Sequence, residues 1–291
     1  MDKKRIIIGA SIASVLVFLM SVVPSSHWVC LIVLSAVCGV ATWEFYNMLE
    51  AGGLKASKKW GTVCGILFVA ATWQYMNKYP DLTTLTGSYL PHDTLLWLTI
   101  LLAVISIFFR ILAYPDMREG LDNALGTLLG FMYVPFLWSF FIRVFLSGDA
   151  TQPAWAGLYL LACMKLSDSG GYFFGTKFGK HKLSPVISPN KSWEGLFGGI
   201  IFCLVINMLW LLLSGGKLGA FSFNLGHALI LSILIPVVGT AGDLVESMFK
   251  RAVGVKDSNT MVYGLGGILD MIDSILFASP LLYIFMKFAL S

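Results

Sequence analysis

Residues 195–213 read GLFGGIIFCLVINMLWLLL, a run of 19 residues without a charged side chain. A helix needs about 20 apolar residues to cross the roughly 30 Å hydrocarbon core of a bilayer, so this stretch predicts a transmembrane helix. The rest of the chain has the same character, because 57% of its 291 residues are hydrophobic and 12% are charged. A soluble domain has roughly 25% charged residues. The composition therefore excludes a soluble globular protein.

Eight further apolar runs flank this stretch, and together they predict an all-α, polytopic integral membrane protein with about nine transmembrane helices. We interpret the first run as a helix because it is longer than the apolar region of a signal peptide and no small-x-small cleavage site follows it. The sixth run along the chain is short, and the eighth contains Pro236. The eight runs are 6–23, 28–48, 60–76, 94–113, 124–146, 154–166, 227–249 and 266–289.

The basic residues predict the orientation of these helices. Nine crossings place 16 of the 20 Lys and Arg residues on one side, which the positive-inside rule identifies as cytoplasmic. We therefore expect a cytoplasmic N-terminus and an external C-terminus.

The net charge is only +4, and the charged residues are scattered along the chain, so we expect no nucleic-acid partner. The five cysteines lie in apolar runs without zinc-site spacing, which indicates neither disulfides nor structural zinc.

Polar interruptions crowd into the second half of the chain, and this asymmetry argues against a transporter built from inverted repeats. We divide the chain into an N-terminal region, 1–150, with about five spans, and a C-terminal catalytic region, 151–291.

Glycines spaced four apart predict close helix packing at Gly61/Gly65, Gly126/Gly130 and Gly195/Gly199. Other glycines lie in polar stretches, where we expect unusual backbone conformations or close ligand approach; they include Gly170, Gly171 and Gly175.

Four carboxylates interrupt apolar sequence near the end of the chain. Asp243 and Glu246 are three residues apart, as are Asp270 and Asp273, so each pair shares a helix face. An uncompensated carboxylate at membrane depth costs at least a few kcal/mol, so these four should line a polar cavity and be paired or bound to metal. Alternatively, Asp270 and Asp273 are simply acids at a helix N-terminus, stabilised by the helix dipole.

The residue types around these acids indicate a phosphate-handling site. Oxygen ligands without nearby His or Cys favour Mg²⁺, which is usually shared with substrate phosphates. Lys250, Arg251 and Lys256 adjoin the acids, although anchoring to anionic lipid is an alternative for any single Lys. Interleaved acids, basic residues and glycines favour phosphoryl or nucleotidyl transfer. Neither a Walker motif nor a G-x-S-x-G elbow is present.

Several blocks of the sequence resemble the phosphatidate cytidylyltransferase (CDP-diacylglycerol synthase) family. Residues 247–257 and 266–274 are similar to its signature, residues 168–195 contain blocks similar to its central loop, and residues 43–46 match more weakly. The resemblance implies transfer of CMP from CTP to phosphatidic acid, giving CDP-diacylglycerol and pyrophosphate. It also implies Mg²⁺, with a second cation as an option, a homodimer, and an active site on the cytoplasmic face of the bacterial inner membrane, where the lipid substrate resides.

The resemblance also assigns roles by position. The implied metal ligands are Asp243, Asp270 and Asp273, and the implied catalytic residues are Lys250, Arg251, Lys256 and Asp257. The implied substrate-binding residues are Asp168, Lys182, Ser188, Lys191, Ser192, Glu194, Glu246 and Ser247. The chain departs from the family pattern at Leu265, which replaces a His, and at Met271, which replaces an Arg.

Three alternatives to this activity remain at the level of the sequence. They are a CTP-dependent lipid kinase, a cytidylyltransferase for another lipid phosphate, and a non-catalytic membrane scaffold or transporter. The departures at Leu265 and Met271 bear more on the lipid substrate or the level of activity than on the reaction type, because the proposed metal carboxylates are retained.

Overall fold

The computed structural model describes residues 21–78, 94–147, 154–254 and 267–290, and most of these residues are helical. Six of the described helices are long and apolar enough to cross a membrane, which confirms the prediction of an all-α polytopic membrane protein. The helices are α2 (Trp28–Ala51), α3 (Lys58–Lys78), α4 (Thr94–Phe109), η2 (Arg110–Ala113), α5 (Met117–Phe131), η3 (Met132–Phe136), α6 (Leu137–Phe145), α7 (Trp155–Phe178), α8 (Trp193–Leu213), α9 (Leu225–Ala252), α10 (Ile268–Phe285) and η4 (Met286–Leu290).

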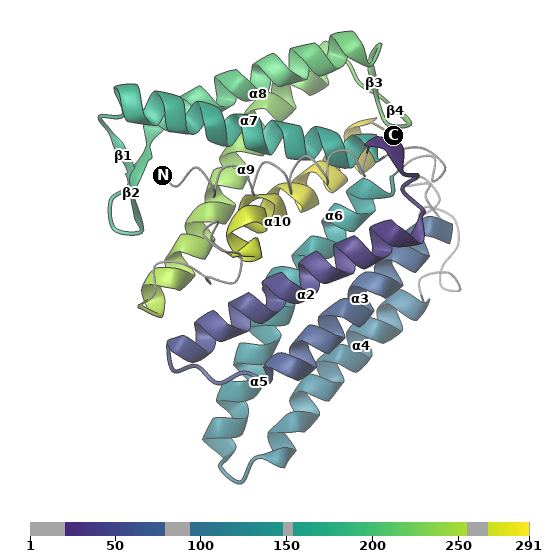
Figure 1. Ribbon diagram of the computed structural model, residues 1–291, viewed down its shortest axis with the longest axis vertical. Coiled ribbons are helices and arrows are strands. Elements are labelled where there is room, and N and C mark those ends of the chain that lie inside the picture. The colour runs from purple at the N-terminus through teal and green to yellow at the C-terminus, as the bar shows by residue number, and fades with distance from the viewer. Residues whose placement is uncertain (1–20, 79–93, 148–153, 255–266, 291) are drawn as a thin grey trace.

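Two short antiparallel hairpins complete the described part of the chain. Strands β1 (Lys182–Ser184) and β2 (Ser188–Ser192) join α7 to α8, and strands β3 (Lys217–Leu218) and β4 (Phe221–Ser222) join α8 to α9. Each hairpin therefore lies at a different end of α8 (Figure 1). The first hairpin is on the same side as the end of α9 and the start of α10, so these three segments converge.

Helix α10 is the centre of the helical arrangement. In Figure 1, α7 and α8 cross the upper part of the molecule as a pair, while α2, α3 and α4 run side by side below them. Helix α10 lies between these groups and contacts α2, α6, α7 and α9. The larger hydrophobic core accordingly draws side chains from both halves of the chain, from Cys30 in α2 to Met286 in η4.

The apolar runs predict most of the helices to within a few residues, and α7 is the main exception. We expected its run to end at residue 166, but the helix continues to Phe178 through the stretch Asp168–Gly175. The expectation of unusual backbone at Gly170, Gly171 and Gly175 is wrong, because all three are helical. At Gly170 an added methyl would lie 2.6 Å from a backbone carbonyl of α8. Close packing against α8 therefore explains this glycine.

Three other features of the predicted runs compare with the structure as follows: one helix start differs, one proline is accommodated, and one run lies mostly beyond what the structure describes. The predicted run 124–146 begins earlier, at Met117, because Asp116 accepts a hydrogen bond from the Arg118 N–H and caps α5. Pro236 lies inside α9 without ending it. The predicted run 6–23 falls almost entirely outside the described residues.

The three glycine pairs expected at helix contacts are confirmed. A methyl added at any of the six would approach another helix or its connecting loop to less than 3.0 Å. Gly61 and Gly130 both face the ring of the fully buried Tyr46, whose hydroxyl donates to the Thr127 carbonyl at 2.7 Å. The glycines therefore let α3 and α5 close on one aromatic side chain of α2.

A π-helical turn interrupts the long helix formed by α5 and α6. This turn, η3, contains Pro135, which lacks the N–H that regular helical hydrogen bonding requires. The turn carries Tyr133, whose ring packs against Phe45 of α2 and Phe249 of α9. Through Tyr133, the first half of the chain contacts the helix that carries much of the predicted site.

Candidate functional site

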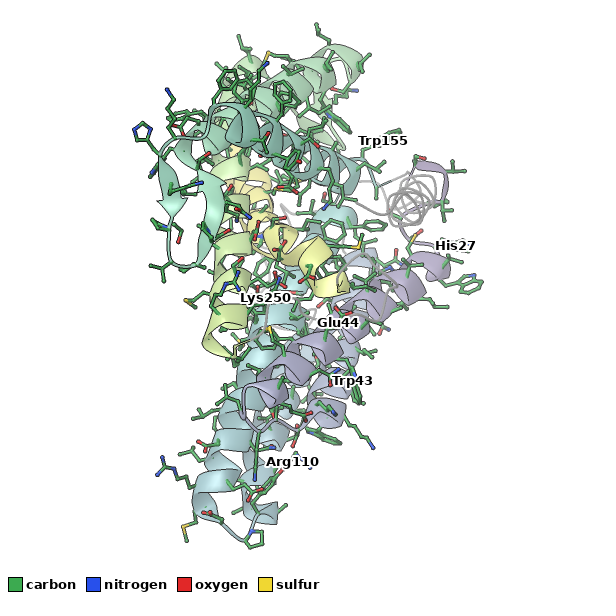
Figure 2. The ribbon with its side chains drawn as sticks, turned by 60° about the vertical axis from the view of Figure 1, so that its left-hand side comes forward. His27, Trp43, Glu44, Arg110, Trp155 and Lys250 are labelled. Carbon is green, nitrogen blue, oxygen red and sulfur yellow. The ribbon has the colours of Figure 1, made fainter. Side chains whose placement is uncertain are left out.

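The centre of the candidate site is Lys250, near the end of α9. Its Nζ atom lies 2.6 Å from Glu246 Oε2 and 2.7 Å from Asp270 Oδ1. Glu246 is one helical turn earlier and almost completely buried, while Asp270 is in the first turn of α10. One ammonium thus joins the two carboxylate pairs that the sequence analysis identified. Figure 2 shows Lys250 at the middle of the molecule, above Glu44 of α2.

A second ion pair joins the first hairpin to α9. Lys191 of β2 reaches Asp243 Oδ2 at 2.7 Å, and its Nζ also donates to the Thr240 carbonyl at 3.4 Å. Ser247 donates to the other oxygen of Asp243 at 3.3 Å. The structure therefore brings Asp243, Lys191 and Ser247 together. Their roles toward metal and substrate remain predictions.

Asp273 completes the group of four acids. It is buried, with 6% of its surface exposed, and its carboxylate neighbours those of Asp243 and Glu246. We name Asp243, Glu246, Asp270 and Asp273 the carboxylate cluster. Four carboxylates and the two ammoniums of Lys191 and Lys250 leave a formal charge of −2. A further cation would therefore be stabilised here.

Asp270 also binds the backbone at the start of its own helix. Its Oδ2 atom accepts from the Gly267 N–H at 3.0 Å, in the manner of a capping box. The alternative drawn from the sequence, an acid placed at a helix N-terminus, is therefore correct as far as it goes. It is incomplete, because the other oxygen of Asp270 contacts Lys250.

Glu44 of α2 supports this helix start, and the sequence analysis did not select it. Its side chain is fully buried, and Oε2 accepts from the Leu269 N–H at 2.9 Å. A carboxylate at a helix N-terminus is favoured by the free N–H groups and the helix dipole. Its other oxygen has no hydrogen-bond partner within the described ranges. Glu44 therefore holds the turn from which Asp270 and Asp273 project.

Tyr133 is a second residue that the sequence analysis missed. Its hydroxyl is buried, has no hydrogen-bond partner among the described residues, and neighbours all four acids of the carboxylate cluster. Tyr133 lies on the π-helical turn η3. An unpaired buried hydroxyl is costly, so we expect Tyr133 to find a partner outside the described residues.

Several predicted substrate-binding residues have structural contacts in and around the first hairpin. Ser192 caps α8 by accepting from the Gly195 N–H at 3.1 Å. Glu194 Oε1 lies 2.6 Å from His181 Nδ1, an ion pair when the imidazole is protonated, and both Glu194 oxygens accept from the His181 N–H at 3.2 Å. These contacts close the hairpin onto α8. Their roles toward substrate remain predictions.

The other predicted site residues lie around the edge of this arrangement. Lys182 is exposed on β1 and takes no part in the ion pairs of the described residues, while Ser188 is half-buried at the start of β2. Arg251 is exposed, and its Nε contacts the Ile187 carbonyl at 3.4 Å. Asp168 is half-exposed on α7. The predicted residues Lys256 and Asp257, and the departure at Leu265, lie outside the described residues.

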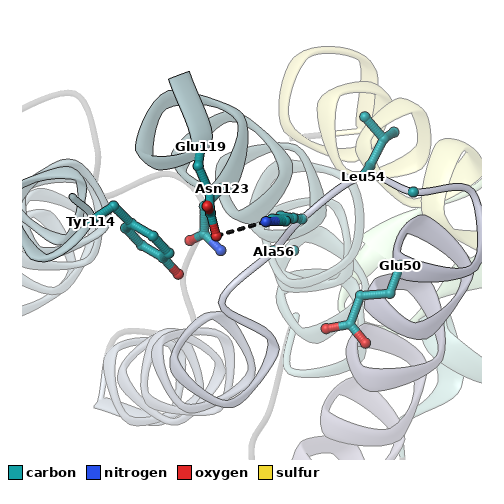
Figure 3. A pocket seen from close by; sticks show the side chains of 8 residues that line it. Glu50, Leu54, Ala56, Tyr114, Glu119 and Asn123 are labelled. Atoms are coloured by element: carbon teal, nitrogen blue, oxygen red, sulfur yellow. Dashed lines mark ion pairs between the residues drawn. The ribbon is translucent and has the colours of Figure 1, made fainter. Parts of the chain in front are cut away.

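A separate pocket of about 400 Å³ lies between the α2–α3 connection and α5 (Figure 3). None of the predicted site residues lines it. Lys55 and Glu119 form an ion pair at 2.7 Å inside it, and the hydrogen bond from this pair raises the pKa of Lys55 above its ordinary value. Since the two side chains satisfy each other, this pocket is a weaker site candidate than the carboxylate cluster.

Comparison with known proteins gives consistent matches. The model of the cytidylyltransferase family matches residues 3–289. A phosphatidate cytidylyltransferase from Haemophilus influenzae is 44% identical over 133 residues, which are 46% of this chain and 46% of that protein. One from Staphylococcus haemolyticus is 46% identical over 127 residues, 44% and 47% of the two chains. One from Staphylococcus saprophyticus is 36% identical over 197 residues, 67% and 73% of the two chains. The aligned segment thus spans about half the length of the first two relatives.

Proposed function

The chain belongs to the cytidylyltransferase family, and from this premise we propose that it transfers CMP from CTP to phosphatidic acid, giving CDP-diacylglycerol and pyrophosphate. The relatives from Haemophilus and Staphylococcus bear the name of this activity. The observation that carries the proposal is the carboxylate cluster with Lys250 at its centre, because acids and cations so interleaved suit a bound triphosphate.

The proposed reaction is an in-line displacement at the α-phosphorus of CTP. An oxygen of the lipid phosphate forms a bond to this phosphorus, and the bond from the phosphorus to the bridging oxygen of pyrophosphate breaks. A phosphomonoester is mostly dianionic at pH 7, since its second pKa is about 6. The reaction therefore needs no strong general base, and the protein contributes positioning and neutralisation of charge.

Within this reaction, the chain's own cations would neutralise phosphate oxygens. Lys250 and Lys191 are each fixed by carboxylates, at 2.6–2.7 Å. Their ammoniums are therefore preorganised and need little reordering when a triphosphate enters. Arg251, which adjoins Lys250 at the end of α9, is exposed, and its long 3.4 Å contact with the Ile187 carbonyl would give way for it to reach the outer phosphates of CTP.

We also propose that Asp243, Asp270 and Asp273 hold Mg²⁺. The formal charge of −2 and the oxygen donors fit a divalent hard cation, and one oxygen of Glu246 has no hydrogen-bond partner in the described part of the chain. In the described part of the chain, no three His, Cys, Asp or Glu side chains form a ready-made metal group. Mg²⁺ is usually bound by one or two carboxylates plus substrate phosphates, so we propose that these three aspartates share the cation with CTP and that not all of them contact it directly. When bound, Mg²⁺ would stabilise negative charge on the reacting phosphates.

The proposal extends to topology and location. We place the enzyme in the bacterial inner membrane, with its N-terminus and carboxylate cluster on the cytoplasmic side, because the positive-inside rule assigns the basic loops to that side. Residues 151–291 would supply the catalytic groups, and residues 1–150 would support them through Glu44 and Tyr133. A homodimer and a second cation remain proposals from the family resemblance alone.

Product formation by the purified protein tests the activity. We expect radiolabelled CDP-diacylglycerol and pyrophosphate from α-labelled CTP and phosphatidic acid, dependent on Mg²⁺. Diacylglycerol and other lipid phosphates complete the substrate panel. Transfer of the γ-phosphate to diacylglycerol would instead identify a lipid kinase, and no turnover with any lipid would favour a scaffold.

Asp243→Asn tests the metal assignment. Loss of a metal ligand worth several kcal/mol should lower the rate at least about 100-fold. The matched control is Asp122→Asn, which changes an exposed acid outside the site and should leave the rate unchanged. Undiminished CDP-lipid formation by a folded Asp243→Asn protein would refute the assignment.

A further inference from the structure

Lys165 of α7 is a cation beside the carboxylate cluster that the proposed mechanism does not use. Its Nζ atom reaches across to α10 and donates to the Met271 carbonyl at 3.3 Å. Met271 lies between Asp270 and Asp273 in sequence. On its own helix, Lys165 is 3.9 Å from Asp168 Oδ2, and Asp168 in turn neighbours Lys191 and Asp243. Lys165 therefore faces the same space as the carboxylate cluster, from the α7 side.

The contacts of Lys165 are looser than those of the other two lysines at the cluster. Lys250 and Lys191 are 13% and 21% exposed and bind carboxylates at 2.6–2.7 Å. Lys165 is 55% exposed, and among the described residues its ion pair is with Asp168 at 3.9 Å, near the limit at which an ion pair contributes to stability. The Lys165 ammonium can therefore bind an incoming anion without breaking a strong ion pair.

The position of Lys165 favours an anion that belongs to a lipid. Its contact on α10 is in the first turn of a helix long enough to cross the membrane, which is where such a helix meets the headgroup region. The next residue, Leu166, is also exposed, so this turn of α7 presents apolar surface as well as a cation. A cation at this depth, on a turn that also exposes apolar surface, matches a phosphate that carries acyl chains.

We propose that Lys165 binds the phosphomonoester of the diacylglycerol phosphate substrate and so forms the lipid side of the active site. This assignment rests on the proposed function. It places the nucleophilic phosphate against α7 and the start of α10, while Lys191 and Lys250 serve the nucleotide. Phosphatidylcholine, a phosphodiester with a cationic headgroup, should bind poorly at the same place.

Steady-state kinetics of Lys165→Met, Lys165→Arg and Lys177→Met in mixed micelles test the proposal. Lys177 is the matched control, because it lies on the same helix with its ammonium over the rings of Phe173 and Phe178. We expect Lys165→Met to raise KM for phosphatidic acid about tenfold or more, with KM for CTP within twofold of wild type. Lys165→Arg should recover most of the loss, and Lys177→Met should match wild type.

Direct binding separates this inference from the proposed function. Calorimetric titration with dihexanoyl phosphatidic acid, dihexanoyl phosphatidylcholine and inorganic phosphate needs no turnover. We expect Lys165→Met to weaken binding of the short-chain phosphatidic acid about tenfold. We also expect wild-type protein to bind inorganic phosphate more weakly than it binds this lipid. If Lys165→Met weakens lipid binding but the wild-type protein makes no CDP-lipid, the proposed function is wrong and the anion site at Lys165 stands.

Three results would overturn the assignment. They are an unchanged KM for phosphatidic acid in Lys165→Met, an equal rise in both KM values, and inorganic phosphate binding as tightly as the lipid. If Lys165→Met does not fold, as judged by a lowered Tm, Lys165→Gln replaces it in the same comparison.

Discussion

Replacing Glu44 tests whether the start of α10 depends on a carboxylate from α2. Glu44→Gln keeps an oxygen that can accept from the Leu269 N–H but removes the charge, while Glu44→Ala removes both. A hydrogen bond to a charged group contributes about 1.5–3 kcal/mol and a neutral one about 0.5–1.5 kcal/mol. We therefore expect Glu44→Gln to cost about 1–2 kcal/mol. Glu44→Ala should cost about 3–4 kcal/mol, because it also leaves a buried N–H unpaired.

These costs should appear in catalysis, because the same turn carries Asp270 and Asp273. A loss of about 1–2 kcal/mol in the transition state corresponds to a 5–30-fold lower kcat, and Glu44→Ala should lose more than 100-fold. The assay is the initial rate of CDP-diacylglycerol formation against Mg²⁺ concentration. We expect half-maximal activation to shift to higher Mg²⁺, since the proposed ligands are less well positioned.

Glu50→Gln is the matched control for Glu44. Glu50 is on the same helix, pairs with Lys58 at 2.8 Å and is 38% exposed, and exposed ion pairs contribute little. We expect its rate to stay within twofold of wild type. A folded Glu44→Ala protein with wild-type kcat and an unshifted Mg²⁺ curve would refute the positioning role.

Three further predictions concern helix packing, charge and metal. Gly170→Ala should lower Tm in detergent, because the methyl meets a carbonyl of α8 at 2.6 Å and overpacking costs about 1–3 kcal/mol. Gly171→Ala has its nearest atom at 3.5 Å and should leave Tm unchanged or higher; equal losses in both would contradict the packing argument. Lys250→Met should destabilise the protein by about 3–5 kcal/mol, since it leaves Glu246 buried and unpaired, whereas Lys58→Met at the surface should have little effect; similar Tm values for the two would count against the buried ion pair. Chelation of divalent cations should abolish turnover, and added Mg²⁺ should restore it and raise Tm by binding the folded state; a rate unaffected by chelator would exclude the metal role.

The helices were predictable from the sequence where apolar length alone decides the structure. The run at residues 195–213 falls within α8, Trp193–Leu213, because a long uncharged stretch has few alternatives in lipid. The end of α7 was not predictable in this way. Asp168 and the glycines that follow resemble a loop locally, and only the contact with α8 shows why they remain helical.

The site was predictable where its residues are close in sequence. The spacing of Asp243 and Glu246 on one face of α9, and of Asp270 and Asp273 on α10, is a local signal that the structure bears out. The Ser192 cap also has a local signal, a serine just before an apolar run.

Residues with distant partners were not predictable in the same way. Glu44 could have been noticed only as an isolated acid inside an apolar run, and nothing in the sequence names its partner on α10. Tyr133 depends on a π-helical turn, and Lys165 depends on α7 continuing as a helix beside α10. In each case, the role of the residue comes from the packing of helices that are far apart in the chain.

The contact between Glu44 and Leu269 has a consequence for how the protein is made. The two residues are separated by 225 positions, and a ribosome adding about 5–20 residues per second needs about 10–45 s to cover that distance. During this interval α2 is already synthesised, and its acid has no helix start to bind. The start of α10 and the carboxylate cluster are therefore among the last parts of the molecule to assemble, and a nascent chain that stalls before α10 leaves the Glu44 carboxylate without its Leu269 partner.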